Sequence, residues 1–301
     1  MTLTNHPGFD LPPVAEATGP FCTQDFLTVV TSYDDGEEIL VASPDAFLAL
    51  RRRDDTILFA GDADVTDYHS PRGEGSEALI ARLAGETSAD RFLLDSLPEE
   101  SAKPLVAGLT HAGWAVETRT HEVAAVLHLP ESVQQYMTDL GKKERHEVRR
   151  KRRRYERMVG EVRHETHAGT GWAFDEFLRL HAAAEGDKGR FMTPERRAFF
   201  ADLAELDGWR FDLLRTHDET AAAIVFGYAD TTGYYLYNSA YEPADSDASP
   251  GVVLLGIMIE SAIAEGWARF DFLKGDETYK FRLGAQRRPL TEISATREAT
   301  P

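Results

Sequence analysis

Residues 248–266, ASPGVVLLGIMIESAIAEG, constrain the fold of this chain more than any other segment. Ser249 is a natural N-cap, and Pro250 suits the first position of a helix. The helix predicted over 250–264 is apolar on nearly every side, so it must be buried against a sheet. Its longest apolar stretch, 251–259, is far shorter than the roughly 20 residues that cross a bilayer. We therefore predict a core helix in an α/β protein and no insertion into a membrane.

Strand and helix patterns alternate along the rest of the chain. Apolar runs bounded by turn residues predict strands at 37–43, 46–52, 56–62, 91–97, 116–129 (or a hairpin there), 161–166, 270–273 and 290–295, and three between 209 and 243. Helical periodicity and caps predict helices at 76–86, 100–114, 172–185, 193–206, 250–264 and 276–284, and one from Ser132 into the basic run described below. The second half thus contains a mainly antiparallel meander.

The length of 301 residues favours two domains. Residues 1–20, rich in Pro, Gly and Thr, predict a loosely attached tail. A first unit is predicted over 21–129 and a second over 130–301. The two halves have loosely similar, strand-rich layouts, although no tandem repeat is evident in the sequence.

A strongly basic run occupies residues 142–157, KKERHEVRRKRRRYER. It carries ten Lys or Arg and three Glu in a chain whose formal net charge is −18. The remainder has 23 basic and 48 acidic residues, a balance near −25. So acidic a protein is repelled by nucleic acid and anionic lipid unless a local patch overrides the global field. This balance argues against a dedicated DNA-binding protein.

The composition excludes other kinds of site. Cys22 is the only cysteine, so no intramolecular disulfide and no cysteine-based metal cage can form. Ten histidines are scattered without a metal-binding spacing, and we expect no metal. The first residues lack the basic and apolar regions of a signal peptide, and we expect the protein in the cytoplasm.

Two segments could carry chemistry. The N-terminus of the helix at 250–264 offers free N–H groups and a positive dipole end, which suits a phosphate, although a capped core helix has the same pattern. In DFLKGDETYKFRLGA (271–285), an apolar strand leads into a helix that contains Tyr279. Tyr279 could protonate a leaving thiolate as a general acid, or it could pack its ring in the core.

Possible general bases are less distinct. No GxSxG elbow, Walker loop or GxGxxG is present. Most Asp and Glu residues of so acidic a chain are solvated surface groups, which is the alternative for each candidate. The carboxylates in or near the predicted strands are Asp212, Asp230, Glu242 and Asp271.

The C-terminal third resembles the GNAT-superfamily acetyltransferases associated with bacterial cellulose biosynthesis, which are two-unit relatives of the Fem-type aminoacyl transferases. The family pattern is a Tyr-rich strand, then SPG opening a helix, then G…DFL.G…YK.R.G. The basic run and the Asp67–Tyr68 pair also match this family. The resemblance is strong over 233–285 and weak before 130. The matching residues of the pattern are Ser249, Pro250, Gly251, Asp271, Gly275, Tyr279, Lys280, Arg282 and Gly284.

The resemblance implies an α/β (α+β) fold of two GNAT-like units in tandem, each a mixed, mainly antiparallel sheet flanked by helices, the first one degenerate. It implies acetyl-CoA or another acyl-CoA as co-substrate, with the pantetheine arm along the central strands and the pyrophosphate on the helix N-terminus. The usual GNAT loop, Q/R-x-x-G-x-G/A, is replaced here by DSDASPG.

The same resemblance assigns expected roles to individual residues. Tyr279 is expected to be the catalytic acid, with Glu242 or Asp271 as the base. The expected cofactor-binding residues are Tyr237, Asn238, Ser249, Gly251, Val252 and Val253. The residues expected to bind substrate or phosphate anions are Lys274, Lys280, Arg282, Arg149 and Arg150.

Three functions remain open from the sequence. The first is an acyl-CoA-dependent N-acyltransferase that acts on a small-molecule or peptide amine. The second is a Fem-like transfer of an aminoacyl group from charged tRNA, with RNA phosphates on the basic run. The third is a catalytically idle GNAT fold that serves as a binding module. The basic run itself is typical of a solvated face that neutralises the protein's own acidic surface, and phosphorylated substrate and RNA are its other candidate partners.

Overall fold

The computed structural model describes residues 6–184 and 186–297, which form two compact units. The first unit contains the described chain up to Ala124 together with the segment that begins at Arg288. The second unit runs from Ala125 to Arg287. The C-terminal strand, predicted in the second unit, thus lies mainly in the first, because it pairs there with an N-terminal strand.

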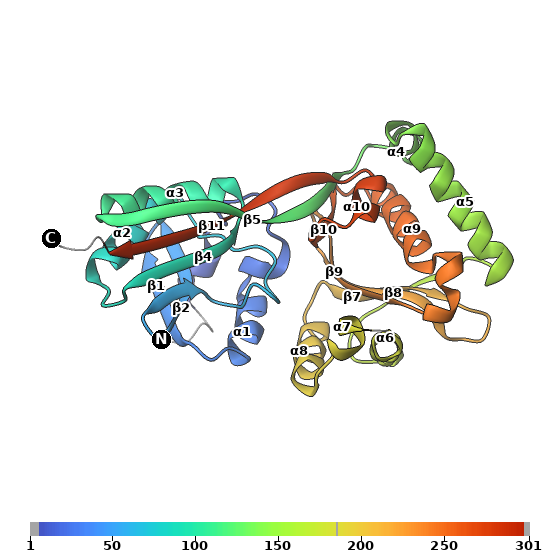
Figure 1. Cartoon of the computed structure of the whole chain (residues 1–301), viewed down its shortest axis with the longest axis horizontal. Helices are drawn as coiled ribbons and strands as arrows, with labels where there is room; N and C mark the ends of the chain where they lie inside the picture. Colours follow the sequence, from blue (N-terminus) through green and yellow to red (C-terminus); the bar gives the residue numbers. More distant parts are fainter. Residues whose placement is uncertain (1–5, 185, 298–301) are drawn as a thin grey trace. The chain divides into compact units, whose positions relative to one another are not determined.

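The first unit is a mainly antiparallel sheet flanked by helices (Figure 1). Its strands, in the order β1-β2-β3-β4-β11-β5, are β1 (Glu37–Ser43), β2 (Ala46–Arg53), β3 (Thr56–Phe59), β4 (Arg91–Leu97), β11 (Gln286–Arg297) and β5 (Trp114–His128). Its helices are α1 (Gln24–Ser32), α2 (Ser76–Glu86) and α3 (Glu99–His111), with the 3-10 helices η1 (Pro7–Asp10) and η2 (Gly19–Cys22). Strands β3 and β4 pair in parallel, whereas β1–β2, β2–β3 and β4–β11 pair antiparallel.

The segment predicted as a loosely attached tail packs on the first unit from His6 onward. Ala15 is 2% exposed, and Pro13 forms an isolated bridge with Arg72. A Cβ at Gly8 would overlap the ring of Phe47, so glycine permits close packing there. The Pro and Gly content therefore reflects irregular but packed backbone, while residues 1–5 lie outside the described range.

The second unit has the strand order β5-β10-β9-β8-β7-β6, to which β5 contributes its last residues. The other strands are β6 (His164–His167), β7 (Trp209–Arg215), β8 (Ala221–Ala229), β9 (Gly233–Tyr241) and β10 (Arg269–Lys274). The helices are α4 (Val133–Asp139), α5 (Lys142–Met158), α6 (Trp172–Ala183), α7 (Asp187–Arg190), α8 (Pro194–Ala204), η3 (Pro243–Ala248), α9 (Pro250–Ala264) and α10 (Thr278–Arg282). Strands β6 to β9 pair antiparallel, and β9 pairs with β10 in parallel.

The apolar helix α9 lies at the centre of the second unit. One side of α9 packs on β7, β8, β9 and β10, and α4 and α5 pack against it from outside the sheet (Figure 1). The opposite face of the sheet is covered by α6 and α8. Contacts on two sides explain why the sequence of α9 is apolar nearly all round. No helix in the described part of the chain is long and apolar enough to cross a bilayer.

Both units contain a run of elements in the same order. The run is β1-β2-β3-α2-β4-α3 in the first unit, followed by β5, and β7-β8-β9-α9-β10-α10 in the second, after which the chain enters β11. In each, an antiparallel three-strand meander is followed by a helix and by a strand parallel to the third one. This confirms the predicted fold class, in which mixed, mainly antiparallel strands are flanked by helices, while the tandem GNAT-like arrangement stays a prediction.

Most predicted elements are present, and the exceptions have physical reasons. The segment at 116–129 is one long strand rather than a hairpin. The helix predicted from Ser132 is interrupted: α4 ends at Asp139 and α5 begins at Lys142, and Arg145 Nη1 donates to the Met137 carbonyl at 2.8 Å across the break. Helix α1 was not predicted, because its sequence QDFLTVVTS is rich in β-branched residues that favour strands.

Candidate functional site

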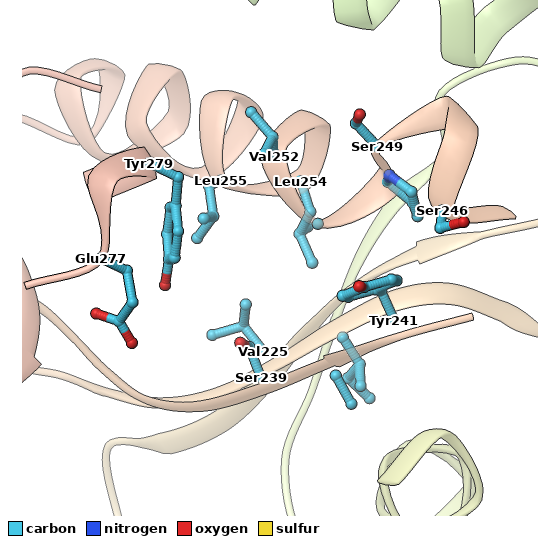
Figure 2. A pocket seen from close by; sticks show the side chains of 14 residues that line it. Val225, Ser239, Tyr241, Ser246, Ser249, Val252, Leu254, Leu255, Glu277 and Tyr279 are labelled. Atoms are coloured by element: carbon cyan, nitrogen blue, oxygen red, sulfur yellow. The ribbon is translucent and has the colours of Figure 1, made fainter. Parts of the chain in front are cut away.

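A cavity of ≈ 340 Å³ opens in the second unit between the sheet and the first turns of α9 (Figure 2). Strands β8 and β9 form one wall and α9 the other, while η3 and the start of α10 contribute the polar ends. The lining residues are Ile224, Val225, Ser239, Ala240, Tyr241, Ser246, Ser249, Pro250, Gly251, Val252, Leu254, Leu255, Glu277 and Tyr279. An apolar middle with polar groups at its ends is typical of a ligand site.

A β-bulge in β9 determines which side chains reach the cavity. Leu236 pairs with Gly227 of β8, and Asn238 pairs with the adjacent Phe226. Tyr237 is therefore an extra residue in the ladder, and such a residue shifts the alternation of side chains by one position.

The shift turns Ser239 and Tyr241 toward α9 and the cavity (Figure 2). Before the bulge, Tyr234 and Leu236 belong to the core cluster that includes α9. Unbroken alternation would have placed Ser239 and Tyr241 on the opposite face of the sheet. The bulge therefore supplies the two hydroxyl groups on the strand side of the cavity.

The first turn of α9 presents backbone N–H groups to the cavity. Ser249 occupies the N-cap position with a left-handed backbone (φ 56°, ψ 48°), and its hydroxyl makes no capping bond. The Ser249 carbonyl accepts the first helical bond, from the Val253 N–H at 3.2 Å. Gly251 and Val252 precede that bond, so their N–H groups have no partner within the helix. These two amides and the helix dipole suit an anionic group.

Tyr279 and Glu277 lie at the other end of the cavity from Ser249 (Figure 2). Burial raises the pKa of Tyr279 above its ordinary value, and the negative charge of Glu277 adds to this effect. The phenol therefore remains protonated at neutral pH. Lys280 Nζ lies 2.9 Å from Glu277 Oε2 and orients that carboxylate.

Among the residues expected from the sequence, the cavity brings together Tyr279, Ser249, Gly251 and Val252. Three expected cofactor residues do not line it. The ring of Tyr237 packs against Trp209 and other rings on the opposite face of the sheet. The bulge pairs Asn238 with Phe226, whose ring lies on that same face, and the Val253 amide is used within the helix.

The structure also gives the two expected bases other roles. Asp271 is fully buried, and its Oδ1 accepts the N–H of Leu273 at 2.8 Å, where the backbone is left-handed (φ 57°). Asp271 thus shapes the end of β10. Glu242 Oε2 accepts from Arg179 Nη1 at 2.7 Å, outside the cavity lining. Neither carboxylate lines the cavity.

None of the five expected anion-binding residues lines the cavity either. Lys280 is 3% exposed, and its ammonium donates to the carbonyls of Lys274 and Gly275 at 2.5 and 3.3 Å. It therefore holds the end of β10. Arg150 forms a bidentate pair with Glu147 at 2.6 and 2.8 Å. The remaining residues of that set, outside the lining, are Lys274, Arg282 and Arg149.

Several lining residues were missed by sequence reasoning. Glu277 lies two positions before Tyr279 at a helix start. This closeness to the candidate acid could have identified Glu277 as a candidate site residue from the sequence. Ser239 and Tyr241 could not be found, because the bulge that turns them inward has no mark in the sequence. Arg154 of α5, which lies outside the lining, is 3.6 Å from Asp247 in η3.

The charge of the site is unusual for a phosphate-carrying ligand. Glu277 is the one charged residue among the lining residues that the structure describes. Asp245 and Asp247 lie in the adjacent η3. Burial and the nearby Glu242 raise the pKa of Asp245 above its ordinary value. In residues 6–184 and 186–297, no cluster of three or more His, Cys, Asp or Glu could hold a metal ion.

Residues 142–281 match the family model described as an acetyltransferase (GNAT) domain. The second unit thus matches a GNAT acetyltransferase domain. Its matched range begins with α5 and ends in α10, and it includes every residue that lines the cavity. The resemblance to GNAT acetyltransferases predicted from the sequence is confirmed at this level.

Solved structures show that the fold similarity extends beyond the GNAT domain. A protein of unknown function from Bacteroides thetaiotaomicron has 11% sequence identity and a TM-score of 0.65, and the match covers 98% of each chain. FemX has 10% identity and a TM-score of 0.63 over 97% of this chain and 96% of its own. L-PGS from Bacillus licheniformis has 10% identity and a TM-score of 0.59 over 91% and 88%. At such identities these matches show the fold alone, and no curated protein matches the sequence.

Proposed function

We propose that the GNAT domain transfers an acyl group, acetyl in the simplest case, from a CoA thioester to an amine. One observation carries this proposal: a protonated tyrosine and a carboxylate lie at one end of a cavity whose other end is the N-terminus of α9. A proton donor, a proton acceptor and an anion-binding helix end are the parts that acyl transfer from CoA requires.

In this proposal the CoA lies along the cavity. Its apolar middle, between Val225 on the sheet and Leu254 and Leu255 on α9, suits the pantetheine arm. The amides of Gly251 and Val252 would receive the pyrophosphate. Arg154, half-exposed beside η3, is a cation that could approach the same phosphates, because its 3.6 Å pair with Asp247 is a weak, exposed one.

In this mechanism Glu277 and Tyr279, at the same end of the cavity, each carry out one proton transfer. The neutral amine of the acceptor attacks the thioester carbonyl, and Glu277 takes one proton from the nitrogen as it becomes positively charged in the tetrahedral intermediate. The tetrahedral intermediate then breaks its C–S bond, and the Tyr279 hydroxyl protonates the leaving thiolate. The proton on Glu277 returns to the tyrosinate through water. In this proposal Glu277 replaces Glu242 and Asp271 as the base.

Calorimetric titration with CoA and acetyl-CoA tests the first requirement. We expect a dissociation constant below about 1 mM, the upper end of ordinary enzyme affinities. Absence of binding at that concentration would contradict the proposal. Binding without transfer to any amine in an acyl-transfer screen would instead favour the idle binding module.

Transfer of an aminoacyl group from charged tRNA is the second candidate. It is favoured by the lining, which among the described residues carries a carboxylate and no Lys or Arg and therefore suits a cationic aminoacyl group. Three exposed cations of α5 could meet RNA phosphates: Arg149, Arg153 and Arg157. This candidate predicts an RNA affinity that falls steeply with salt, whereas a flat response would exclude it.

The finer relationship to the acetyltransferases associated with cellulose biosynthesis is also a proposal. It rests on the SPG and DFL.G…YK.R.G pattern, whose Ser249, Gly251 and Tyr279 line the cavity. An acyl-CoA substrate would place the activity in the cytoplasm. The acceptor proposed with it is a small-molecule or peptide amine.

A further inference from the structure

The segment from Pro243 to Ser249 forms the wall of the cavity at the start of α9. Ser246 and Ser249 from this segment line the cavity, and Ala248 is fully buried. Its own backbone bonds are local, such as Asp245 N–H to the Glu242 carbonyl at 3.0 Å and Ser249 N–H to the Ser246 carbonyl at 3.0 Å. Local turns do not fix the direction of a segment, so its two ends need anchors.

The first end is anchored by an ion pair that comes from the other side of the sheet. Arg179 lies on α6, which packs on the face opposite α9. Its Nη1 donates to Glu242 Oε2 at 2.7 Å, immediately before η3 begins. The Glu242 backbone N–H donates to the carbonyl of Ala222 in β8 at 2.9 Å. Glu242 is thus fixed through both its main chain and its side chain.

Arg179 is itself held before it reaches Glu242. Its Nε and Nη2 donate to the two carboxylate oxygens of Glu176 at 2.9 and 3.0 Å, and Nη2 also donates to the Ala221 carbonyl at 3.1 Å. Glu176 in turn accepts the Ala221 N–H at 2.7 Å. Burial acts to raise the pKa of Glu176, but the bonds from Arg179 and Ala221 outweigh it and lower that pKa. A guanidinium already fixed at two of its three nitrogens, Nε and Nη2, loses little freedom when Nη1 binds Glu242.

The other anchor of the segment is much weaker. Arg154 and Asp247 are 3.6 Å apart, and the Asp247 side chain is 81% exposed. The Arg179–Glu242 pair is shorter, and its side chains are 38% and 28% exposed. Partial shielding and a bidentate neighbour make the Arg179 contact the stronger constraint.

We propose that Arg179 is a positioning residue for the cavity, acting through Glu242 to hold residues 243–249 in the conformation that builds the cavity wall. Neither Arg179 nor Glu242 is among the lining residues. Glu242 accordingly has a positioning role rather than that of a base. The proposal concerns the shape of the cavity, and only its ligand-binding arm rests on the proposed function.

Hydrogen exchange of the full-length protein tests the conformational arm. Glu242→Ala removes the acceptor while leaving Arg179 paired with Glu176. We expect exchange of residues 243–252 to become about tenfold faster or more, with the rest of the unit unchanged. Glu242→Gln keeps an acceptor oxygen and should give a smaller increase. The matched control, Arg163→Gln, removes an exposed pair with Glu219 (3.1 Å) and should leave the segment unchanged.

Unchanged exchange of residues 243–252 in folded Glu242→Ala would overturn the proposal. A cycle with Arg179→Gln, Glu242→Gln and the double variant gives the second arm, measured as acetyl-CoA affinity. We expect the double variant to lose no more affinity than the weaker-binding single variant, because both remove the same constraint. Fully additive losses would contradict the coupling. If wild type binds no CoA, the proposed function fails while the exchange experiment still decides this inference.

Discussion

Tyr279 is the residue whose replacement tests the chemistry most directly. Tyr279→Phe keeps the ring in place and removes the proton donor at the cavity. We expect the rate of acyl transfer to fall by about 10²–10⁴-fold, the usual contribution of a general acid, with little change in acetyl-CoA affinity. Steady-state kinetics and calorimetry measure the two quantities.

A matched control distinguishes chemistry from packing. Tyr136→Phe, in the same unit, also removes a hydroxyl, one that donates to the Leu283 carbonyl at 3.1 Å. This variant should retain its transfer rate even if its stability falls slightly. An equal loss of rate in both variants would remove Tyr279 from the mechanism.

Ser249 carries a conformational prediction. Its backbone is left-handed, which costs a non-glycine residue about 1–2 kcal/mol. Because its hydroxyl makes no capping bond, Ser249→Gly should increase the free energy of unfolding by about 0.5–1 kcal/mol after the entropy of glycine in the unfolded chain is deducted.

Urea unfolding checks this prediction, with Ser246→Gly as the control. Ser246 lies in the same segment but has no positive φ, so glycine there should be neutral or destabilising. A loss of stability in Ser249→Gly would mean that the serine hydroxyl stabilises the start of α9 in another way.

Single residues also show what the sequence could and could not predict about the site. Tyr279, Ser249 and Gly251 line the cavity, and their place could be predicted because it depends on local order: a strand end, a helix start and a cap. Asp271 and Lys280 belong to the same local pattern but turn into the protein, where they bond backbone groups at the end of β10. Residue type and spacing do not tell which way a side chain points at a strand end.

At the scale of elements, the hydrophobic periodicity of the sequence was enough to predict a helix or strand wherever that element is buried on one side or on all sides. The bounds of α9 and β4 follow from apolar runs and caps, and the structure has them at the predicted residues. The bulge at Tyr237 was not predictable, because the register of β9 depends on pairing with β8 rather than on the sequence of β9 alone. That one extra residue decides the polar lining of the cavity.

The pairing of β6 with β7 gives a prediction about pH. Asp212 of β7 is fully buried and accepts from Thr166 Oγ1 at 2.8 Å and from Arg210 Nε at 3.0 Å, and it lies 3.1 Å from His164 Nε2. Burial acts to raise the pKa of Asp212, but the bonds from His164 and Thr166 and the charge of Arg210 outweigh it, so that pKa is lowered.

A carboxyl with a lowered folded-state pKa stabilises the fold above its unfolded pKa, about 3.9, and this contribution is lost as the pH falls through the folded value. Asp212→Asn should therefore lower the free energy of unfolding by about 1–3 kcal/mol at neutral pH. The difference from wild type should shrink below about pH 4. Urea unfolding of both proteins at several pH values measures this difference in the free energy of unfolding. A difference that stays constant down to acid pH would contradict the lowered pKa of Asp212.

At the scale of the whole molecule, the net charge of −18 sets the approach of an anionic substrate. Asp245 and Asp247 add to this repulsion beside the cavity. Salt screens charges over roughly 10 Å at 0.1 M, so the association rate of CoA should rise between low and moderate salt.

Stopped-flow measurements of CoA binding at increasing salt test this expectation. RNA held by the cations of α5 would show the opposite trend, an affinity that falls with salt. A CoA association rate that decreases with salt would mean that α5, rather than the acidic remainder, governs the approach.

The pairing of β11 with β4 has a consequence for how the protein is made. In the first unit β11 lies between β4 and β5, yet it begins only at Gln286, after the whole range that matches the GNAT domain. During synthesis, the edges of β4 and β5 that will pair with β11 therefore lack their partner strand while the ribosome completes more than half of the chain. The N-terminal half cannot reach its final form first, so the two halves must mature together, and nascent chains stalled before residue 286 should be preferred clients of chaperones that shield open strand edges.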